Sequence, residues 1–199
     1  MSHYYEKKQT SPINLQQFSA VILGEGLEFY TGSGVFSKSK IDKGSLLLAN
    51  KAIIQDGWKV LDFGCGYGPI GIAVAKEYPS AKVLMSDVNK RAVGLAKKNI
   101  ELNNLRNASA IQSDMFENIK EKFNAILLNP PQSAGKELCI KMIGQSKNFL
   151  FPGGLFQMVA RHNIGGSQLE KHMIKVFGNV KEIAKKSGYR IYVSEMKET

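Results

Sequence analysis

Asn129, Pro130 and Pro131 are the residues best suited to chemistry on a nitrogen atom, because they place a rigid group of acceptors at the end of a strand. They close an apolar run that predicts a buried strand at 123–129. Each proline fixes its own φ, and the residue before a proline is held extended. The Asn129 side-chain carbonyl and the Pro130 carbonyl could accept both hydrogens of an exocyclic amine and aim its lone pair. The simpler alternative is a strand terminator that only blocks pairing.

The segment LDFGCGYGPIG (61–71) is a glycine-rich loop between a predicted strand and a predicted helix. Gly64, Gly66 and Gly68 let the backbone turn tightly and approach a ligand closely. The helix N-terminus behind them suits a nucleotide-type cofactor. The spacing is G-x-G-x-G, however, and Pro69 stands where the dinucleotide fingerprint G-x-G-x-x-G requires its third glycine.

Carboxylates stand at the ends of three successive predicted strands. Asp62 precedes the glycine loop, where it would repel a pyrophosphate and suit a cofactor that carries an amino group and a sulfonium. Asp87 ends the strand 81–87, the position from which ribose hydroxyls are bound, and Asp114 ends the strand 108–114 and could meet an adenine amine. Open α/β sheets bind ligands at this edge, so we expect a cofactor site. For each aspartate alone, capping of the following helix or turn is the alternative.

These motifs lie in a chain whose predicted strands and helices alternate. Further predicted elements are strands at 58–64 and 153–160, a pair of strands within 180–195, helices at 45–54 (with Ser45 as cap), 69–78, 91–103, 135–150 and 166–178, and a hairpin at 18–31. This alternation indicates an α/β fold with a seven-stranded, mainly parallel sheet. The pair within 180–195 is joined by a short turn and must be antiparallel, so one strand near an edge is reversed. We expect a flexible segment at 1–16 and one domain over 17–199, with its core at 58–195.

The chain has 199 residues, 43% hydrophobic and 22% charged, which is typical of a soluble globular protein. No apolar run predicts a membrane span, and the first ten residues lack the apolar segment of a secretory signal. Two cysteines, Cys65 and Cys139, are too few for a disulfide framework or a zinc site, which suits the reducing cytoplasm. The formal net charge of +10 favours a polyanionic partner such as nucleic acid, although solubility alone would also explain it.

In their order along the chain, the motifs VLDFGCGYGPIGIAVA, SDVN, QSDMF and LLNPP resemble those of class I S-adenosylmethionine-dependent methyltransferases. The flanking segments SGVFSKSKIDKGSLLL, NPPQSAGK and GYRIYVS narrow the resemblance to the small-domain methyltransferase family, which includes the bacterial 16S rRNA guanine-N2 methyltransferases. The resemblance implies a Rossmann-like sheet with helices on both faces and S-adenosyl-L-methionine as cofactor. It also implies methylation of an exocyclic amine of RNA, with guanine N2 of small-subunit rRNA as the expected target and the small subunit as the expected partner.

The resemblance also implies roles for individual residues. The expected cofactor-binding residues are Asp62, Gly64, Cys65, Gly66, Gly68, Asp87, Val88, Asp114 and Met115. The expected catalytic residues are Asn129, Pro130 and Pro131, which need no metal and no covalent intermediate. Cys65 is included among the cofactor-binding residues because of its position in the glycine loop, and no thiol chemistry is expected of it.

One residue departs from the related N-methyltransferases, many of which carry an aromatic residue after the prolines to stack on a flipped base. Here the residue is Gln132. Stacking contributes about 1–3 kcal/mol per base, so another side chain must supply it. Phe36 is a candidate, equally well explained as a core aromatic. Lys136 could neutralise an RNA phosphate, and so could the connector lysines Lys38, Lys40 and Lys43.

Two other functions are compatible with the same residues. N-methylation of another amine, adenine N6 in DNA or a glutamine side chain of a protein, would use the same tip. The larger rRNA enzymes of this family carry a duplicated N-terminal domain, which this sequence lacks. The second alternative is a non-catalytic RNA-binding or assembly protein that keeps the cofactor fold. The intact glycine loop and the intact Asn-Pro-Pro tip argue against it.

Overall fold

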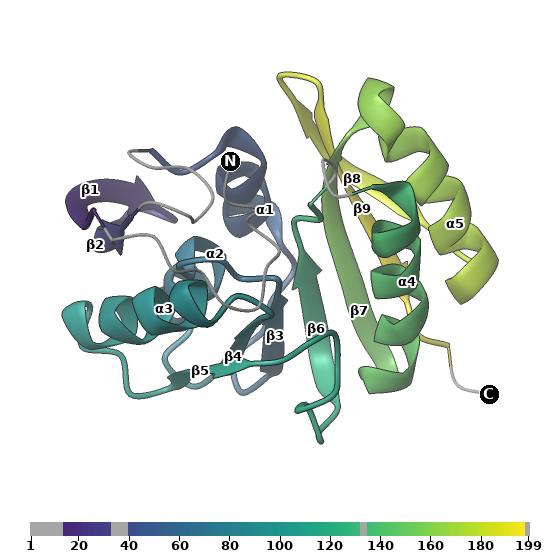
Figure 1. Cartoon of the computed structure of the whole chain (residues 1–199). Coiled ribbons are helices and arrows are strands. Elements are labelled where there is room, and N and C mark those ends of the chain that lie inside the picture. The colour runs from purple at the N-terminus through teal and green to yellow at the C-terminus, as the bar shows by residue number, and fades with distance from the viewer. Residues whose placement is uncertain (1–13, 33–39, 132–134, 198–199) are drawn as a thin grey trace.

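The computed structural model describes residues 14–32, 40–131 and 135–197. Its centre is a seven-stranded sheet in the order β5-β4-β3-β6-β7-β9-β8 (Figure 1). The strands are β3 (Lys59–Phe63), β4 (Lys82–Asp87), β5 (Ala108–Gln112), β6 (Phe123–Leu128), β7 (Leu150–Arg161), β8 (Lys181–Lys186) and β9 (Tyr189–Glu195). The strands from β5 to β7 are parallel, and β9 is antiparallel to both of its neighbours. The predicted sheet with one reversed strand near an edge is confirmed.

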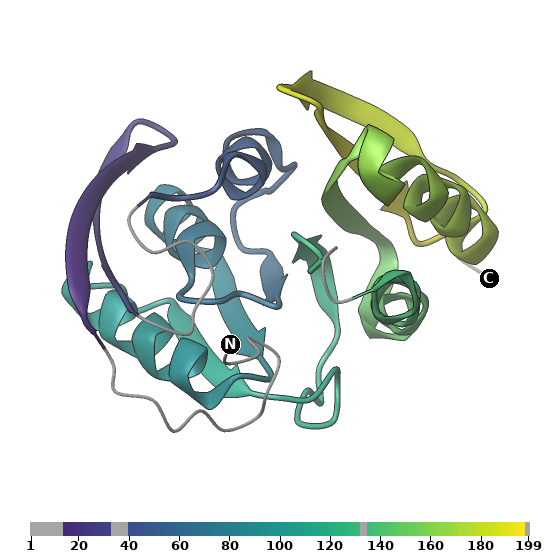
Figure 2. The same ribbon diagram turned by 45° about the horizontal axis from the view of Figure 1, so that its top comes forward.

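Five helices in the described part of the chain cover the two faces of this sheet (Figure 2). They are α1 (Lys43–Lys51), α2 (Pro69–Glu77), α3 (Lys90–Leu102), α4 (Lys136–Ser146) and α5 (Ser167–Phe177). Successive strand residues point to opposite faces, so Ala125 and Leu127 of β6 face α1, α2 and α3. Ile126 and Leu128 face α4 and α5, and all four side chains are fully buried. No helix formed by the described residues is both long and apolar enough to cross a membrane.

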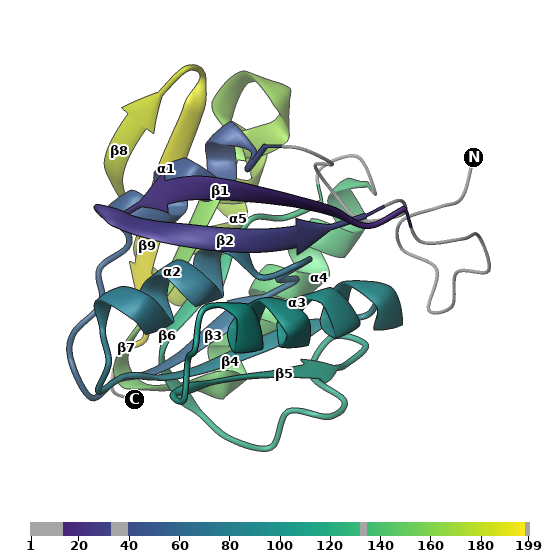
Figure 3. The ribbon, with the colours of Figure 1, turned by 90° about the vertical axis from the view of Figure 1, so that its left-hand side faces the viewer.

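A two-stranded hairpin, β1 (Gln16–Ile22) and β2 (Glu25–Thr31), lies outside the main sheet and runs across α2 and α3 (Figure 3). Two side-chain amides, one on α3 and one at its C-terminal cap, bond to the backbone of β2. Asn99 bonds to the N–H (2.6 Å) and C=O (2.9 Å) of Tyr30, and Asn103 to the N–H (3.1 Å) and C=O (2.7 Å) of Glu28. The helix therefore pairs with the edge of β2 as a neighbouring strand would.

Helix α1 begins earlier than the sequence predicts, and the predicted cap is wrong. The expected helix at 45–54 starts at Lys43, because Asp42 and not Ser45 caps it. The Asp42 carboxylate accepts hydrogen bonds from the backbone N–H groups of Gly44 (2.9 Å) and Ser45 (3.0 Å). A carboxylate and a hydroxyl three residues apart can both cap a helix, and the sequence alone does not rank them.

Other element ends also differ from the predictions. β5 ends at Gln112, so Asp114 lies in the turn that follows the strand. The helix predicted at 135–150 ends at Ser146 and continues as a short turn, η2 (Lys147–Phe149), while a wide turn, η3 (His162–Gly166), joins β7 to α5.

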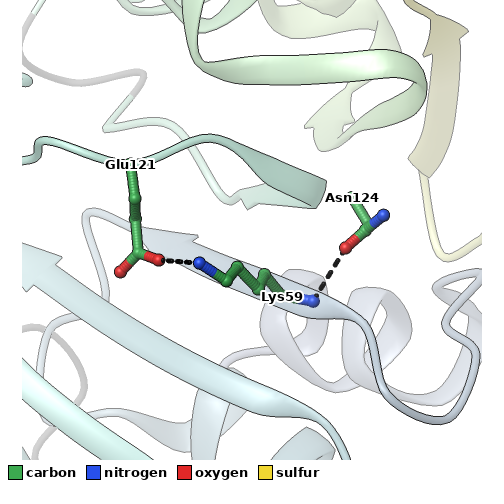
Figure 4. A network of polar contacts seen from close by, with 3 residues as sticks. All are labelled: Lys59, Glu121 and Asn124. Carbon is green, nitrogen blue, oxygen red and sulfur yellow. Dashed lines mark hydrogen bonds and ion pairs between the residues drawn. The ribbon is translucent and has the colours of Figure 1, made fainter.

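A group of polar contacts aligns β3 with β6 at the end remote from the glycine loop (Figure 4). The Lys59 backbone N–H donates to Asn124 Oδ1 at 2.9 Å, and Lys59 Nζ pairs with Glu121 Oε2 at 2.6 Å. The ion pair is exposed and contributes little stability, about 0–1 kcal/mol. In the same register Phe63 pairs with Leu128. The loop after β3 and the Asn-Pro-Pro tip after β6 therefore emerge side by side.

Candidate active site

The carboxyl ends of the parallel strands border a cavity of about 520 Å³, a volume within the usual range for small-molecule sites. The predicted residues that line it are Gly64, Cys65, Gly66, Asp87, Val88, Asp114, Met115, Asn129, Pro130 and Pro131. Asp62, Gly68 and Lys136 are not among the residues of its wall. Phe36 and Gln132 lie outside the described residues.

The glycine loop is held in shape by hydrogen bonds to the end of β4. The N–H groups of Gly64 and Cys65 donate to the Ser86 carbonyl at 2.8 and 2.9 Å. The N–H of Gly66 donates to Asp87 Oδ2 at 2.9 Å. Gly64 and Gly66 have φ angles of 73° and 60°, in the left-handed region that favours glycine. The loop therefore presents backbone to the cavity in a conformation that other residues rarely adopt.

Asp62 and Gly68 lie behind the loop, where they join it to α2. A Cβ at Gly68 would lie 2.9 Å from Met85 Sδ, so this glycine permits close packing. The Asp62 carboxylate is 1% exposed and accepts a hydrogen bond from the Gly71 N–H at 2.8 Å. Burial raises the pKa of Asp62 to about 7, against the opposing effect of the Gly71 bond and with a further rise from the charge of Asp87. Asp62 thus supports the start of α2 from behind the loop and does not form part of the cavity wall.

The contribution of Asp62 to the stability of the protein is expected to fall as the pH rises from about 4 to about 7. The Asp62 pKa is 3.8 in an unperturbed chain and about 7 in the folded protein, so the folded state binds more protons in this window and the free energy of unfolding declines. Asp62→Asn keeps an oxygen for Gly71 and should remove this decline. Urea unfolding between about pH 4 and 8, without cofactor, measures the difference between variant and wild type. The difference in the free energy of unfolding should grow up to about pH 7 and then level off. A difference that is constant with pH would contradict the raised pKa of Asp62.

Asp87 ends β4 and fixes the backbone on both sides of it. Its Oδ2 accepts from the Gly66 N–H at 2.9 Å, and its Oδ1 accepts from the Asn89 N–H at 2.8 Å. The residue is 4% exposed and lines the cavity. The Asp87 carboxylate thus supports the glycine loop and also borders the space that a ligand would occupy.

The turn that follows β5 is strained and lies at the cavity wall. Met115 has a φ of 53°, a conformation that costs a residue with a side chain about 1–2 kcal/mol. The Ser113 hydroxyl stabilises the turn, because it donates to the Met115 carbonyl at 2.9 Å and accepts from the Asn118 N–H at 3.1 Å. Ser113, Asp114 and Met115 all line the cavity. The turn after β5, and not the strand itself, therefore presents Asp114.

Two buried hydroxyls at the cavity wall, those of Tyr67 and Ser86, have no hydrogen-bond partner within the part of the chain that the structure describes. The two residues are 2% and 1% exposed. Buried polar atoms are almost always paired, and a polar atom of a ligand in the cavity would supply a partner for each hydroxyl. Burial raises the pKa of Tyr67 well above its usual value, which keeps its hydroxyl able to donate. The cavity thus combines hydroxyls with carboxylates, as a ligand with ribose and amino-acid portions requires.

Asn129 follows β6 directly, and its side-chain amide is held by the N-terminus of α1. Its Nδ2 donates to Ser45 Oγ at 2.9 Å and to Asp42 Oδ1 at 3.2 Å. A carboxylate can only accept hydrogen bonds, so Asp42 determines which end of the amide faces α1. The Asn129 amide nitrogen therefore donates to residues at the start of α1. The carbonyl oxygen is the acceptor group of this side chain.

Sequence reasoning missed Asp42 and Ser45 as residues of the site. Both line the cavity, and one oxygen of Asp42 both caps α1 and binds Asn129. The segment IDKGS contains the signal, a carboxylate and a hydroxyl at a helix start. Their common partner is Asn129, which lies 87 residues beyond Asp42, and only the tertiary structure pairs them.

A second missed group comes from the end of β7 and the start of β9. Arg161 and Tyr189 both line the cavity and are paired directly in the sheet. The Arg161 guanidinium carbon lies 5.0 Å from the centroid of the Tyr189 ring, a cation–π arrangement. A Cβ at Gly44 would lie 2.9 Å from Tyr189 Cε1, so the absence of a side chain at Gly44 lets the ring pack against α1.

The lysine candidates that the structure describes are not among the residues that line the cavity. Lys136 and Lys43 are exposed at the starts of α4 and α1, Lys40 is exposed, and Lys38 lies outside the described residues. His162 Nδ1 lies 2.6 Å from the hydroxyl of the buried Tyr192, a structural contact. The residues described include no group of three or more His, Cys, Asp or Glu side chains placed to hold a metal ion.

Comparisons with known proteins identify the family. The family described as Methyltransferase small domain matches residues 26–193. The uncharacterized protein YbxB of Bacillus subtilis (strain 168) is 36% identical over 194 residues, which cover 95% of this chain and 96% of YbxB. Ribosomal RNA small subunit methyltransferase C of Psychromonas ingrahamii is 34% identical over 177 residues, which cover 87% of this chain and 48% of that protein.

A solved structure agrees with these relatives. The T. thermophilus 16S rRNA N2 G1207 methyltransferase, in complex with AdoMet and guanosine, matches with a TM-score of 0.82 and 28% identity, over 92% of this chain and 51% of that one. The chain therefore spans about half the length of these two named methyltransferases. The match confirms the resemblance carried by the glycine loop, the strand-end aspartates and the Asn-Pro-Pro tip. The protein belongs to the methyltransferase small domain family.

Proposed function

We propose that the protein is an S-adenosyl-L-methionine-dependent N-methyltransferase that acts on an exocyclic amine of RNA, with guanine N2 of small-subunit rRNA as its target. One observation carries this proposal. The Asn129 amide is anchored through its nitrogen by Asp42 and Ser45, and its carbonyl oxygen, at the wall of a nucleotide-type cavity, accepts no hydrogen bond from the described residues. An acceptor in that place suits an amine substrate, which has hydrogens to donate.

The residues of the cavity fit S-adenosylmethionine. Asp87 would accept from the ribose hydroxyls, and Asp114 from the adenine amine. The unpaired hydroxyls of Tyr67 and Ser86 would meet polar atoms of the same ligand. The glycine loop at Gly64 would admit the ligand without side-chain obstruction. When bound, this cofactor supplies a methyl group activated by a positively charged sulfur.

The Asn-Pro-Pro tip would prepare the amine. The lone pair of an exocyclic amine is delocalised into the base, so the nitrogen is a poor nucleophile. Asn129 Oδ1 and the Pro130 carbonyl would accept its two hydrogens, localise the lone pair and stabilise the positive charge that develops on the nitrogen. A positional error of about 1 Å can lower a rate about a hundredfold. The two prolines and the anchored amide limit such errors.

RNA is the substrate that the comparisons and the charge support. The solved relative is in complex with AdoMet and guanosine, and it is named a 16S rRNA methyltransferase. The net charge of +10 favours a polyanion. Two free, buried cysteines, Cys65 and Cys139, suit the cytoplasm, where ribosomal subunits are found.

Methyl transfer to separated cellular fractions tests the proposal. The purified protein is incubated with radiolabelled S-adenosylmethionine and with naked rRNA, small ribosomal subunits, genomic DNA or ribosomal protein. Nucleosides and amino acids are then identified by mass spectrometry. N2-methylguanosine in rRNA is the expected product. N6-methyladenine in DNA or methylglutamine in protein would show that the substrate is another amine. The absence of methyl transfer to every fraction would favour a non-catalytic binding protein.

Ser45→Ala is expected to lower kcat about three- to tenfold. The variant loses one of two hydrogen bonds that hold the Asn129 amide, and such a bond contributes about 0.5–1.5 kcal/mol. KM for RNA and Kd for the cofactor should stay close to wild type, because the helix cap is supplied by Asp42. Ser45→Thr keeps a hydroxyl and should recover part of the rate. A raised KM with unchanged kcat would contradict this positioning role, and so would a Thr variant as slow as the Ala variant.

A further inference from the structure

The tip of the β8–β9 hairpin is positively charged and adjoins the cavity. A second pocket of about 280 Å³ lies at this tip, and its lining includes Lys185, Lys186, Tyr189 and Arg190. None of the described residues that line it is acidic. Tyr189 lines both the second pocket and the cavity, so the two hollows adjoin at this residue.

The strand register places three side chains in a row. Arg161 of β7 is paired with Tyr189 of β9, and Tyr189 is paired with Lys186 of β8. Directly paired residues point to the same face of a sheet. A guanidinium, an aromatic ring and an ammonium therefore succeed one another from the rim of the cavity, where Arg161 lies, to the tip of the hairpin.

Two cations of the hairpin face each other, and only one of them has an acidic partner among the described residues. Lys185 and Arg190 lie directly opposite each other, and like charges in that position destabilise a sheet. Arg190 is paired with Glu182 at 2.6 Å. Lys185 and Lys186 are exposed and make no ion pair with any residue in the described ranges.

The tip is held rigidly. Ser187 and Gly188 have φ angles of 50° and 79°, as in the tight two-residue turns of hairpins. The His162 N–H of η3 donates to the Gly188 carbonyl at 3.1 Å. The backbone that carries the two lysines is therefore fixed relative to the end of β7, next to the cavity.

We propose that the RNA strand flanking the target nucleotide leaves the cavity across Tyr189. Its phosphates are bound by Lys186, which lies beside the ring, and by Lys185, which points to the other face of the strand but also lines the second pocket. The proposal rests on the proposed function for the choice of RNA as partner. A nucleic acid provides both features that the row requires, phosphates for the cations and flat bases or sugars for the ring. Tyr189 also offers a stacking surface in a protein whose residue after the prolines is Gln132 and not an aromatic.

The test compares the double variant Lys185→Gln/Lys186→Gln with a matched control, Lys97→Gln/Lys98→Gln. The control pair is exposed on α3, which packs on β4 and β5 at the opposite edge of the sheet (Figure 1). The Kd for a fluorescein-labelled, guanine-containing single-stranded RNA is measured by anisotropy between about 50 and 300 mM salt. The hairpin variant should bind roughly tenfold more weakly and show a salt slope shallower by about 1.4, about 0.7 for each lost phosphate contact. The control variant should retain nearly the wild-type slope.

The outcomes separate this proposal from the proposed function. Equal weakening by both lysine pairs would show a diffuse attraction and overturn the assigned path. A polyglutamate peptide that binds as tightly as the RNA, and is lost in the hairpin variant, would assign the tip to an acidic protein instead. In methyl-transfer assays the hairpin variant should show a raised KM for RNA, with kcat and cofactor Kd near wild type. If the wild-type protein bound RNA through the hairpin tip but methylated none, the proposed function would be wrong. The proposed path of the RNA strand would still be supported.

Discussion

Asn129→Ala should lower the rate of methyl transfer by roughly 10²–10³, the loss typical of removing one preorganised polar group that faces a transition state. The variant removes the oxygen proposed to accept from the amine. The cofactor residues on the glycine loop and at Asp87 are untouched, and Asp42 still caps α1 through Gly44 and Ser45. The Kd for S-adenosylmethionine should therefore stay close to wild type. Single-turnover kinetics with saturating RNA, beside calorimetry with the cofactor, measures the two effects separately.

Asn129→Asp is the informative companion to this variant. It keeps acceptor oxygens but places a second carboxylate where the amide nitrogen now lies, 3.2 Å from Asp42 Oδ1. Like charges at that distance repel each other, so the side chain should turn away and activity should stay low. A rate within about threefold of wild type in Asn129→Ala would reduce the Asn-Pro-Pro tip to a strand terminator. The proposed chemistry would then lose its support.

Asp87→Ala should weaken cofactor binding roughly 10- to 150-fold, because a hydrogen bond to a charged group contributes about 1.5–3 kcal/mol. The substitution removes the proposed ribose acceptor. It also leaves the N–H groups of Gly66 and Asn89 without their carboxylate partner, so the glycine loop loses one of its supports. Calorimetric titration with S-adenosylmethionine gives the Kd, and circular dichroism shows whether the variant is folded.

Two further variants make the Asp87 result specific. Asp56→Ala removes an exposed carboxylate from the loop before β3 and should leave the Kd unchanged. Asp87→Asn keeps one acceptor oxygen and should bind the cofactor with intermediate affinity. A folded Asp87→Ala protein with wild-type affinity would remove Asp87 from the cofactor site.

The order of elements and the parallel sheet could be predicted from the sequence, because they depend on local patterns. Apolar runs of strand length alternate with amphipathic helices, and the short turn at Gly188 requires a reversed strand. The ends of elements were less predictable. Asp42 and Ser45 are both good caps, and the choice of Asp42 accompanies a tertiary contact with Asn129.

The residues of the site also fall into two groups, those that local sequence predicts and those that only the tertiary structure brings to the cavity. The glycine loop and Asp87 could be found because a ligand-binding loop and the strand after it are close in sequence. Asp62 was predicted beside the cofactor, but strand alternation turns it away from Leu61 and Phe63 and toward α2. Arg161 and Tyr189 carry no local motif. They reach the cavity because the register of β7 with β9 brings them together.

The amides of Asn99 and Asn103 protect one edge of the hairpin from pairing with another chain. An unpaired edge strand is a template on which another chain can form β-structure. On β2, the N–H and C=O groups of Glu28 and Tyr30 are already bonded to α3. Many proteins protect such an edge with charged side chains, prolines or bulges. Here a helix of the same domain closes the inner edge of the hairpin, and an aggregating strand would first have to displace it.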